Sequence, residues 1–195
     1  MNEARSELCA LYLILKSDVD QCKELLSDKY TGVWDRVYTK AVFSMIEGIS
    51  FRIRQYVVSA VDAGLYSLDI PSINFLSETT YKIDLSGKIK EKGEYLVFLP
   101  GFKFTFKSFG RCLGMEEFVE KAFGDNGFNN FKKSVDIRNR LTHPKRTQEM
   151  RVGGSELELI ESSEEWFHAL VLPLIERAFE IENQSNAKFG ESASA

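Results

Sequence analysis

Histidine and cysteine are scarce in this chain, and their scarcity excludes several kinds of site. Two histidines and three cysteines occur among 195 residues, and so small a number argues against a dedicated His/Cys metal centre. Cys9, Cys22 and Cys112 are odd in number, widely spaced and without a Cys-x-x-Cys pair. This pattern favours reduced thiols in a cytoplasmic protein over a disulfide framework or a zinc site. We therefore expect no metal site and no cofactor.

Long apolar runs are missing as well. No stretch approaches the roughly 18 apolar residues that a membrane-spanning helix needs. Residues 8–15 are apolar, but Glu3 and Glu7 precede them, and Lys16 and Asp18 cut the run short. An export signal instead carries positive charge ahead of its apolar core. The sequence therefore predicts neither a signal peptide nor a membrane partner.

The motifs of several large enzyme classes are also absent. The sequence has no Walker loop, no Gly-x-Gly-x-x-Gly after a strand, no His-Glu-x-x-His and no Gly-x-Ser-x-Gly. The net charge of −4 argues against broad, non-specific affinity for nucleic acid, which needs a positive footprint. A local basic cluster nevertheless occurs at Lys132, Lys133, Arg138, Arg140, Lys145, Arg146 and Arg151. The alternative interpretation of this cluster is a solvated basic face.

What the chain does contain is a helical pattern typical of a globular domain. The composition is 44% hydrophobic and 28% charged, with fifteen phenylalanines, which indicates one folded domain with an aromatic core. Apolar residues at three- and four-residue steps predict helices over 3–27, over about 30 residues ending near Gly64, over 115–123, and up to Thr142. Ser162-x-x-Glu165 resembles a capping box that opens a last helix. We expect a mainly α-helical domain over 1–185 and a flexible tail over 186–195.

A change of period interrupts the helices at about 80–108. Tyr81, Ile83 and Leu85 alternate with polar residues, and so do Phe102, Phe104 and Phe106. Alternation of this kind is typical of strands. The sequence therefore predicts a small antiparallel β insertion, whose three phenylalanines cover apolar surface of the domain or of a partner.

The most informative segment is 134–144, at the end of a predicted helix. At about 100° per residue, Arg138 points between two apolar flanks of the helix, which is costly unless an anionic group meets it. Asn139 and His143 are four residues apart and share the neighbouring face. Pro144 disfavours α geometry at His143, so the imidazole sits at the helix end. A fixed cation, an amide and an imidazole in this arrangement suit a phosphate ester.

Alternatives to this interpretation are structural. Arg138 would then pair with a buried carboxylate, while Asn139 and His143 only end the helix. The functional interpretation also includes Glu47, which lies between Phe43 and Phe51 at four-residue steps. Its carboxylate would orient Arg138.

The alternative for Glu47 is a solvated side chain, or an ion pair with Arg54 or Arg36. Asp136 projects toward His143, or pairs with Lys132 or Arg140.

Arg138-Asn139-x-x-x-His143 resembles the Arg-x4–6-His signature of the HEPN superfamily, in which the residue after the arginine is often asparagine. The resemblance implies an antiparallel bundle of four to five helices. It also implies a metal-independent endoribonuclease, as in toxins of toxin–antitoxin and phage-defence systems, with Arg138, His143 and Asn139 as catalytic residues. Glu47 and Asp136 would support them. The residues expected to bind RNA are Lys132, Lys133, Arg140, Lys145 and Arg146.

The resemblance further implies a homodimer whose two motif helices face each other and form a composite site. The products would be a 2′,3′-cyclic phosphate and a 5′-hydroxyl, and an antitoxin or defence-system protein would restrain the enzyme. Apolar residues on two sides of the second helix also favour a dimer, because one small bundle would not cover both. The alternatives are a non-catalytic HEPN-like module that binds RNA or nucleotide or acts as a scaffold, and a purely structural interaction protein.

Overall fold

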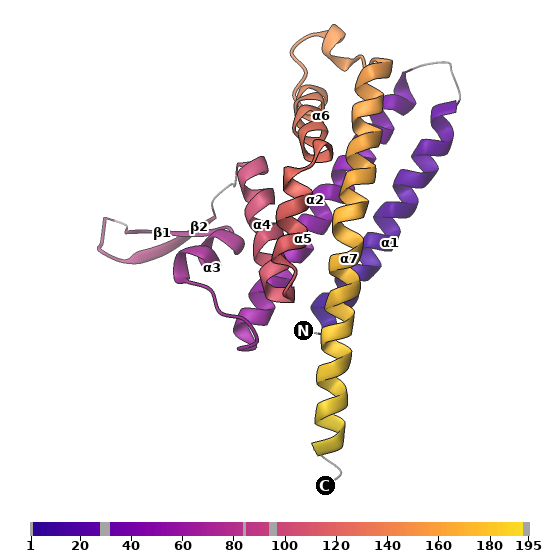
Figure 1. Ribbon diagram of the computed structural model, residues 1–195. Coiled ribbons are helices and arrows are strands. Elements are labelled where there is room, and N and C mark those ends of the chain that lie inside the picture. Colours follow the sequence, from indigo (N-terminus) through magenta and orange to yellow (C-terminus); the bar gives the residue numbers. More distant parts are fainter. Residues whose placement is uncertain (1, 28–31, 84, 94–96, 193–195) are drawn as a thin grey trace.

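Helices make up most of the part of the chain that the computed structural model describes, which is residues 2–27, 32–83, 85–93 and 97–192 (Figure 1). The mainly helical fold class is thus confirmed. The helices are α1 (Asn2–Glu24), α2 (Val33–Asp62), α3 (Ile70–Leu76), α4 (Phe98–Leu113), α5 (Glu116–Gly124), α6 (Asn126–Thr142) and α7 (Gly154–Ser192). Two short 3-10 helices lie at Leu25–Ser27 and Thr147–Met150, and two strands, β1 (Thr79–Ile83) and β2 (Ile89–Gly93), form one hairpin.

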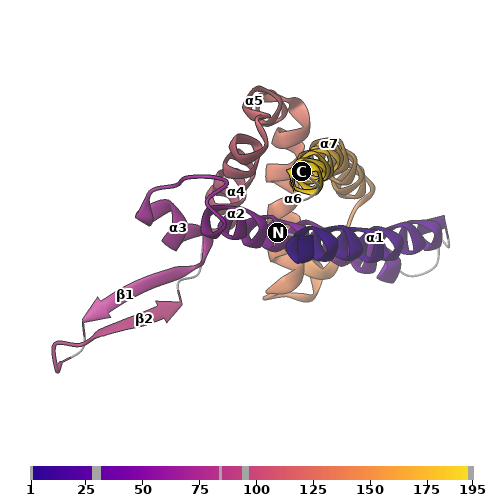
Figure 2. The same ribbon diagram turned by 90° about the horizontal axis from the view of Figure 1, so that it is seen from below.

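The first two helices form an antiparallel pair (Figures 1 and 2). They approach closely at Gly48, where an added Cβ would lie 3.1 Å from a methyl carbon of Leu15. The chain leaves α2 at Gly64, which adopts the left-handed conformation with φ 68° that glycine takes at no steric cost. This end of the helix agrees with the sequence prediction.

Aromatic side chains of α4, α6 and α7 form the centre of the core. The ring of Phe102 lies 4.6 Å from that of Phe106 and 4.9 Å from that of Phe131, which itself stacks 5.2 Å from Trp166. Phe43, on the second apolar strip of α2, is buried against Phe131. A single chain therefore covers both apolar sides of α2 at this level, so burial of α2 does not by itself require a second copy.

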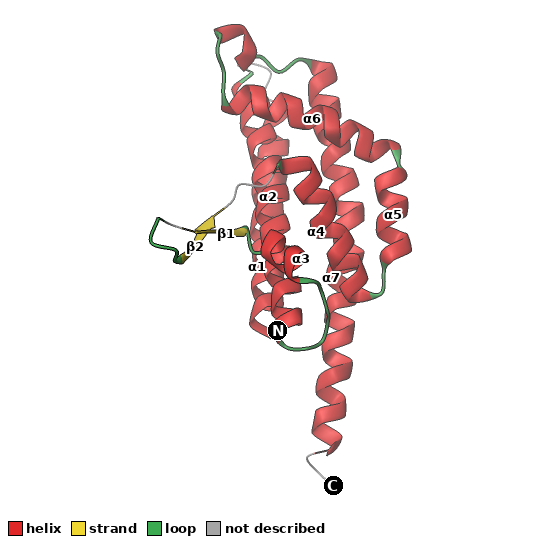
Figure 3. Ribbon diagram, turned by 90° about the vertical axis from the view of Figure 1, so that its left-hand side faces the viewer, coloured by secondary structure: helices red, strands yellow, loops and turns green. Residues whose placement is uncertain are grey.

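The expected β insertion is wrong over its second half. The hairpin spans only 79–93, with Tyr81 opposite Glu91 in its register, and it projects from the helices (Figure 2). Phe102, Phe104 and Phe106 lie instead on α4 (Figure 3). The wider pattern explains this, because Phe98, Phe102, Phe106, Phe109 and Leu113 recur at four- and three-residue steps. Pro100 falls in the first turn of α4, where proline costs no hydrogen bond.

The start of the last helix also differs from the expectation. Helix α7 begins at Gly154, so Ser162 lies within it and caps nothing. The N-terminal contact comes from Glu156, whose Oε2 accepts a hydrogen bond from the Gly153 N–H at 3.0 Å. The hydroxyl of Ser162 meets Asn130 at 3.0 Å. At its other end α7 continues to Ser192, within the segment expected as a tail, while residues 193–195 lie outside the described chain.

Candidate functional site

Helix α6 places the motif at the surface of the bundle. Phe128, Phe131, Val135, Ile137 and Leu141 are all buried, as the helical pattern predicted. Arg138 lies between these flanks and keeps 27% of its side chain exposed. The guanidinium is therefore held by the fold without being closed off from solvent.

Three neighbours fix the position of Arg138. Its Nη2 forms an ion pair with Oε1 of Glu47 on α2, and its Nη1 donates to Oδ1 of Asn139 at 3.0 Å. The guanidinium carbon lies 5.8 Å above the ring of Phe98 at the start of α4. The side chain of Glu47 is 38% exposed. The structure thus pairs the arginine with a carboxylate, and that pair remains open to a solvent-borne ligand.

His143 ends α6 and points into solvent. Its backbone N–H donates to the Asn139 carbonyl at 3.0 Å, and its φ of −127° and ψ of 57° are no longer helical. Within the described chain, no hydrogen bond or ion pair holds the imidazole. Asn139 uses its side-chain oxygen on Arg138. The asparagine therefore orients the arginine.

Asp136 and Arg140 turn toward a different part of the surface. Arg140 forms a forked pair with Glu156 of α7, with both N–O distances at 2.9 Å. Together with Asp136 and Lys133 these residues line a shallow pocket of about 370 Å³. Among the described residues Asp136 has no ion pair, so the expected contacts with Lys132 or Arg140 are absent.

The other residues expected to bind RNA are mostly accessible. Lys132, Lys133, Lys145 and Arg146 are exposed, whereas Arg140 is half-buried by its pair with Glu156. Lys132 also lies 5.3 Å above the ring of Phe128. Lys145 and Arg146 follow directly after His143 and Pro144. The end of α6 therefore carries a local cationic surface on a chain of net negative charge.

A pocket of about 450 Å³ opens beside Arg138, and the sequence did not predict it. Its lining comes from α2, the end of the α3 segment, α4 and α6, and consists of Glu47, Ser50, Arg54, Glu78, Phe98, Gly101, Phe102 and Arg138. Arg54 contributes a second ion pair, at 2.6 Å to Glu78. Glu47 is therefore not the partner of Arg54, nor of Arg36, which instead donates to the Met150 carbonyl at 3.3 Å. Burial lowers the pKa of Arg54, and the nearby Glu78 carboxylate opposes that shift.

His168 belongs to a separate polar cluster between α1, α2 and α7. Its Nδ1 lies 2.8 Å from the Tyr12 hydroxyl and its Nε2 lies 3.4 Å from Oε1 of Glu164. Glu164 also accepts from Tyr38 at 2.6 Å and from Lys23 at 3.0 Å. Burial raises the pKa of Tyr38, and the hydrogen bond to Glu164 raises it further. These contacts give His168 a structural role.

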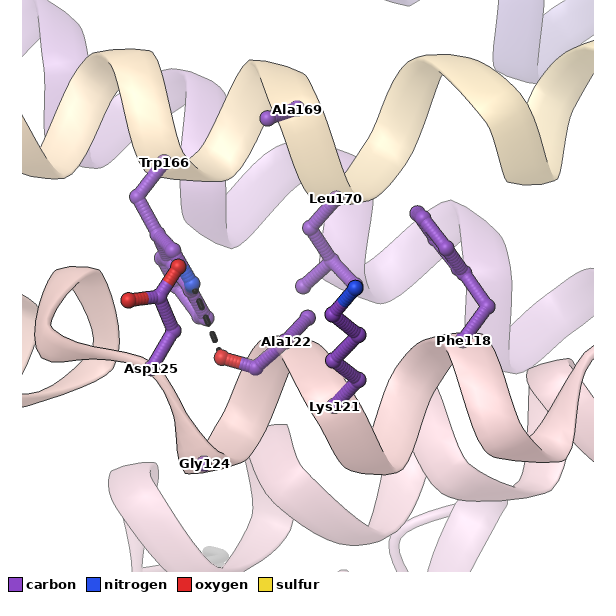
Figure 4. Close-up of a pocket in the computed structure, with 8 residues that line it drawn as sticks. All are labelled: Phe118, Lys121, Ala122, Gly124, Asp125, Trp166, Ala169 and Leu170. Atoms are coloured by element: carbon purple, nitrogen blue, oxygen red, sulfur yellow. Dashed lines mark hydrogen bonds between the residues drawn. The ribbon is translucent and has the colours of Figure 1, made fainter.

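A third pocket, of about 690 Å³, lies between α5 and α7 and shares no residue with the motif (Figure 4). Phe118, Ala122, Trp166 and Leu170 form its apolar walls, with Lys121 and Asp125 also lining it. The indole N–H of Trp166 donates to the Ala122 carbonyl at 3.1 Å, which fixes the ring as one wall. The chemistry of this pocket is apolar packing, not proton transfer.

None of the helices in the described ranges is long and apolar enough to cross a membrane. In the same ranges, no three His, Cys, Asp or Glu side chains gather where they could hold a metal ion. Comparison with known proteins gave no match to any family model, any curated protein or any solved structure.

Proposed function

We propose that this chain is a metal-independent endoribonuclease of the HEPN type, with an antiparallel bundle of that family at its centre. The observation that carries the proposal is the position of Arg138. Glu47 and Asn139 hold it half-exposed at a helix end, one turn from a solvent-facing His143. A fixed guanidinium matches the charge and the fork geometry of a phosphate diester.

Cleavage of RNA without metal needs a base, an acid and a cation. The base takes the 2′-hydroxyl proton, the acid protonates the leaving 5′-oxygen, and positive charge stabilises the transition state. His143 suits proton transfer because imidazole ordinarily titrates near neutral pH, and Arg138 supplies the charge. Since one chain offers one imidazole at this site, a homodimer would supply acid and base from its two copies. The products are a 2′,3′-cyclic phosphate and a 5′-hydroxyl.

The test is RNA cleavage by the purified chain and by a His143→Ala variant. We expect the wild type to cut RNA in the presence of EDTA, and the variant to be slower by roughly 10²–10⁴-fold. Arg138→Ala should be slowed at least as much and Asn139→Ala less, because the amide only orients the arginine. Arg177→Ala is a matched control, since Arg177 pairs with Glu180 on an exposed face of α7 at 2.8 Å. Cleavage that persists in His143→Ala would overturn the mechanism.

A second function is a non-catalytic module that binds RNA or nucleotide or scaffolds an assembly. The observation in its favour is that no described residue orients the His143 imidazole, whereas Arg138 is firmly held. A wild type that binds several RNAs and cuts none of them would establish this alternative. A toxin or phage-defence role belongs with the nuclease, and it requires a partner protein that restrains cleavage in the host cell.

A further inference from the structure

The pocket beside Arg138 contains two ion pairs, and each is formed through one N–O contact. Arg138 meets Oε1 of Glu47, and Arg54 meets Oε1 of Glu78. Among the described residues, the second carboxylate oxygen of each pair meets no hydrogen-bond donor. A carboxylate has four lone-pair sites, so each can accept further hydrogen bonds from a ligand.

Glu78 lines this pocket and has an unusual backbone conformation. It follows the end of α3 and adopts a φ of 53°, the one non-glycine residue with positive φ in the described ranges. For a residue other than glycine, a positive φ costs free energy. The backbone therefore keeps this conformation only where neighbouring groups hold it.

Glu78 is held by its ion pair with Arg54. The side chain of Arg54 is 13% exposed and its guanidinium lies 5.6 Å above the Phe51 ring. The Glu78 side chain itself is 40% exposed. The buried arginine therefore anchors an accessible carboxylate.

An aromatic ring completes the pocket. Phe98 is half-buried and lines the cavity between Arg138 and Phe102. Unstacked bases of single-stranded RNA are bound by stacking on such rings and by hydrogen bonds to their polar edges. A volume of about 450 Å³ lies within the range of small-molecule sites.

We propose that this pocket binds a guanine base of single-stranded RNA, in the nucleotide next to the phosphate that Arg138 holds. Phe98 is the stacking platform, and the Glu78 carboxylate accepts hydrogen bonds from guanine N1–H and the N2 amino group. Guanine alone among the four bases presents two adjacent donor groups on this edge, so one carboxylate distinguishes it from the others. Arg54 is a positioning residue that holds Glu78. The inference rests on the proposed function, because it takes RNA as the ligand and Arg138 as the phosphate contact.

The test measures binding of short, fluorescently labelled oligouridines that carry one central guanosine, inosine or adenosine. The His143→Ala protein serves as the background, so that the RNA stays intact. The guanosine oligomer should bind about 10- to 100-fold more tightly than the adenosine oligomer. Inosine lacks the N2 amino group, and its oligomer should fall between the two.

Glu78→Gln should remove the preference for guanosine, so that the guanosine and adenosine oligomers bind with equal affinity. Phe98→Leu should weaken binding of the guanosine oligomer by loss of stacking. Glu116→Gln is the matched control, because Glu116 forms an exposed pair with Arg111 at 2.9 Å between α4 and α5. This variant should keep the full preference. A melting temperature measured for each variant separates loss of recognition from loss of the fold.

The outcomes distinguish this inference from the nuclease itself. Equal affinity for the three oligomers, no binding of any, or a preference that survives in Glu78→Gln overturns the guanine site. Cleavage by the wild type without regard to base supports the nuclease and rejects the pocket. Guanosine-selective binding by a wild type that never cuts supports the pocket and rejects the nuclease.

Discussion

Glu164 places a charge inside the bundle, with 4% of its side chain exposed. Burial alone would raise the pKa of this carboxyl group. The nearby His168 imidazole and the hydrogen bonds from Tyr38 and Lys23 outweigh that effect and bring the pKa to about 2. A buried carboxylate with several donors is tied to the folded state, since removing either side leaves an unpaired polar group.

This pKa predicts how stability depends on pH. The folded-state pKa lies below the ordinary value of 4.5, so the unfolded chain binds the proton more readily. The stabilisation, roughly 3 kcal/mol, is complete above about pH 4.5 and is lost as the pH falls toward 2. Glu164→Gln should lower the free energy of unfolding by about this amount at neutral pH and flatten its acid dependence. Urea titrations at several pH values measure both effects.

Glu165→Gln is the matched control, because Glu165 is the exposed neighbour on the same helix. It should unfold like the wild type at every pH. If Glu164→Gln kept the wild-type acid dependence, the charge of Glu164 would not be coupled to folding.

At the level of single residues, the sequence predicted some residues of the candidate site and missed others. Arg138, Asn139, His143 and Glu47 stand out because they interrupt regular helical periods, and three of them meet in the structure. The partners Glu78 and Phe98 were missed. They come from a turn and a helix start with no fixed spacing to the motif, so only the packing of α3 and α4 against α2 reveals them.

At the level of elements, the boundaries of helices were predictable where one period dominated. Helix α2 ends as expected because its apolar steps continue without a competing pattern up to Gly64. Phe102, Phe104 and Phe106 fit both a strand and a helix. The helix forms because Phe102 and Phe106 are buried together, while Phe104 contacts Phe75 of α3 at 4.9 Å on another side. The three phenylalanines alone fit both periods, whereas the steps from Phe98 to Leu113 and the packing of α4 both favour the helix.

The contact between α6 and α7 depends on the absence of a side chain at Gly127. An added Cβ would lie 2.7 Å from Cγ of Trp166, closer than real carbon contacts allow. Gly127→Ala should therefore displace the indole from Phe131 and from its hydrogen bond to Ala122. The expected loss is roughly 1–3 kcal/mol in the free energy of unfolding, as for other overpacked cores.

Gly124→Ala provides the comparison, since nothing lies within 4 Å of a Cβ added there. It should leave stability unchanged or raise it by up to about 1 kcal/mol. Denaturant midpoints at constant slope measure both changes. Equal stability of the two variants would show that α6 and α7 can separate slightly without cost.

At the level of the whole molecule, charge is unevenly distributed. The chain carries a net charge of −4, yet Lys145, Arg146 and the partly exposed Arg138 gather at the end of α6. A negative molecule with a local cationic surface is steered toward an anion in one orientation. Binding of RNA at this end would therefore weaken as salt rises.

The proposed nuclease needs two imidazoles near one phosphate, so the whole molecule should be a homodimer with the ends of α6 facing each other. Such a dimer should bury at least about 1,200 Å² in total.

The two cationic ends would repel across the two-fold axis, and salt screens that repulsion. We therefore expect the dimer to tighten from low to moderate salt in sedimentation velocity. Replacing Lys145 and Arg146 with glutamine should tighten it at low salt, whereas the same change at the distant Lys103 and Lys107 should have no effect. A monomer at tens of micromolar protein in every salt would remove both the dimer and the composite site.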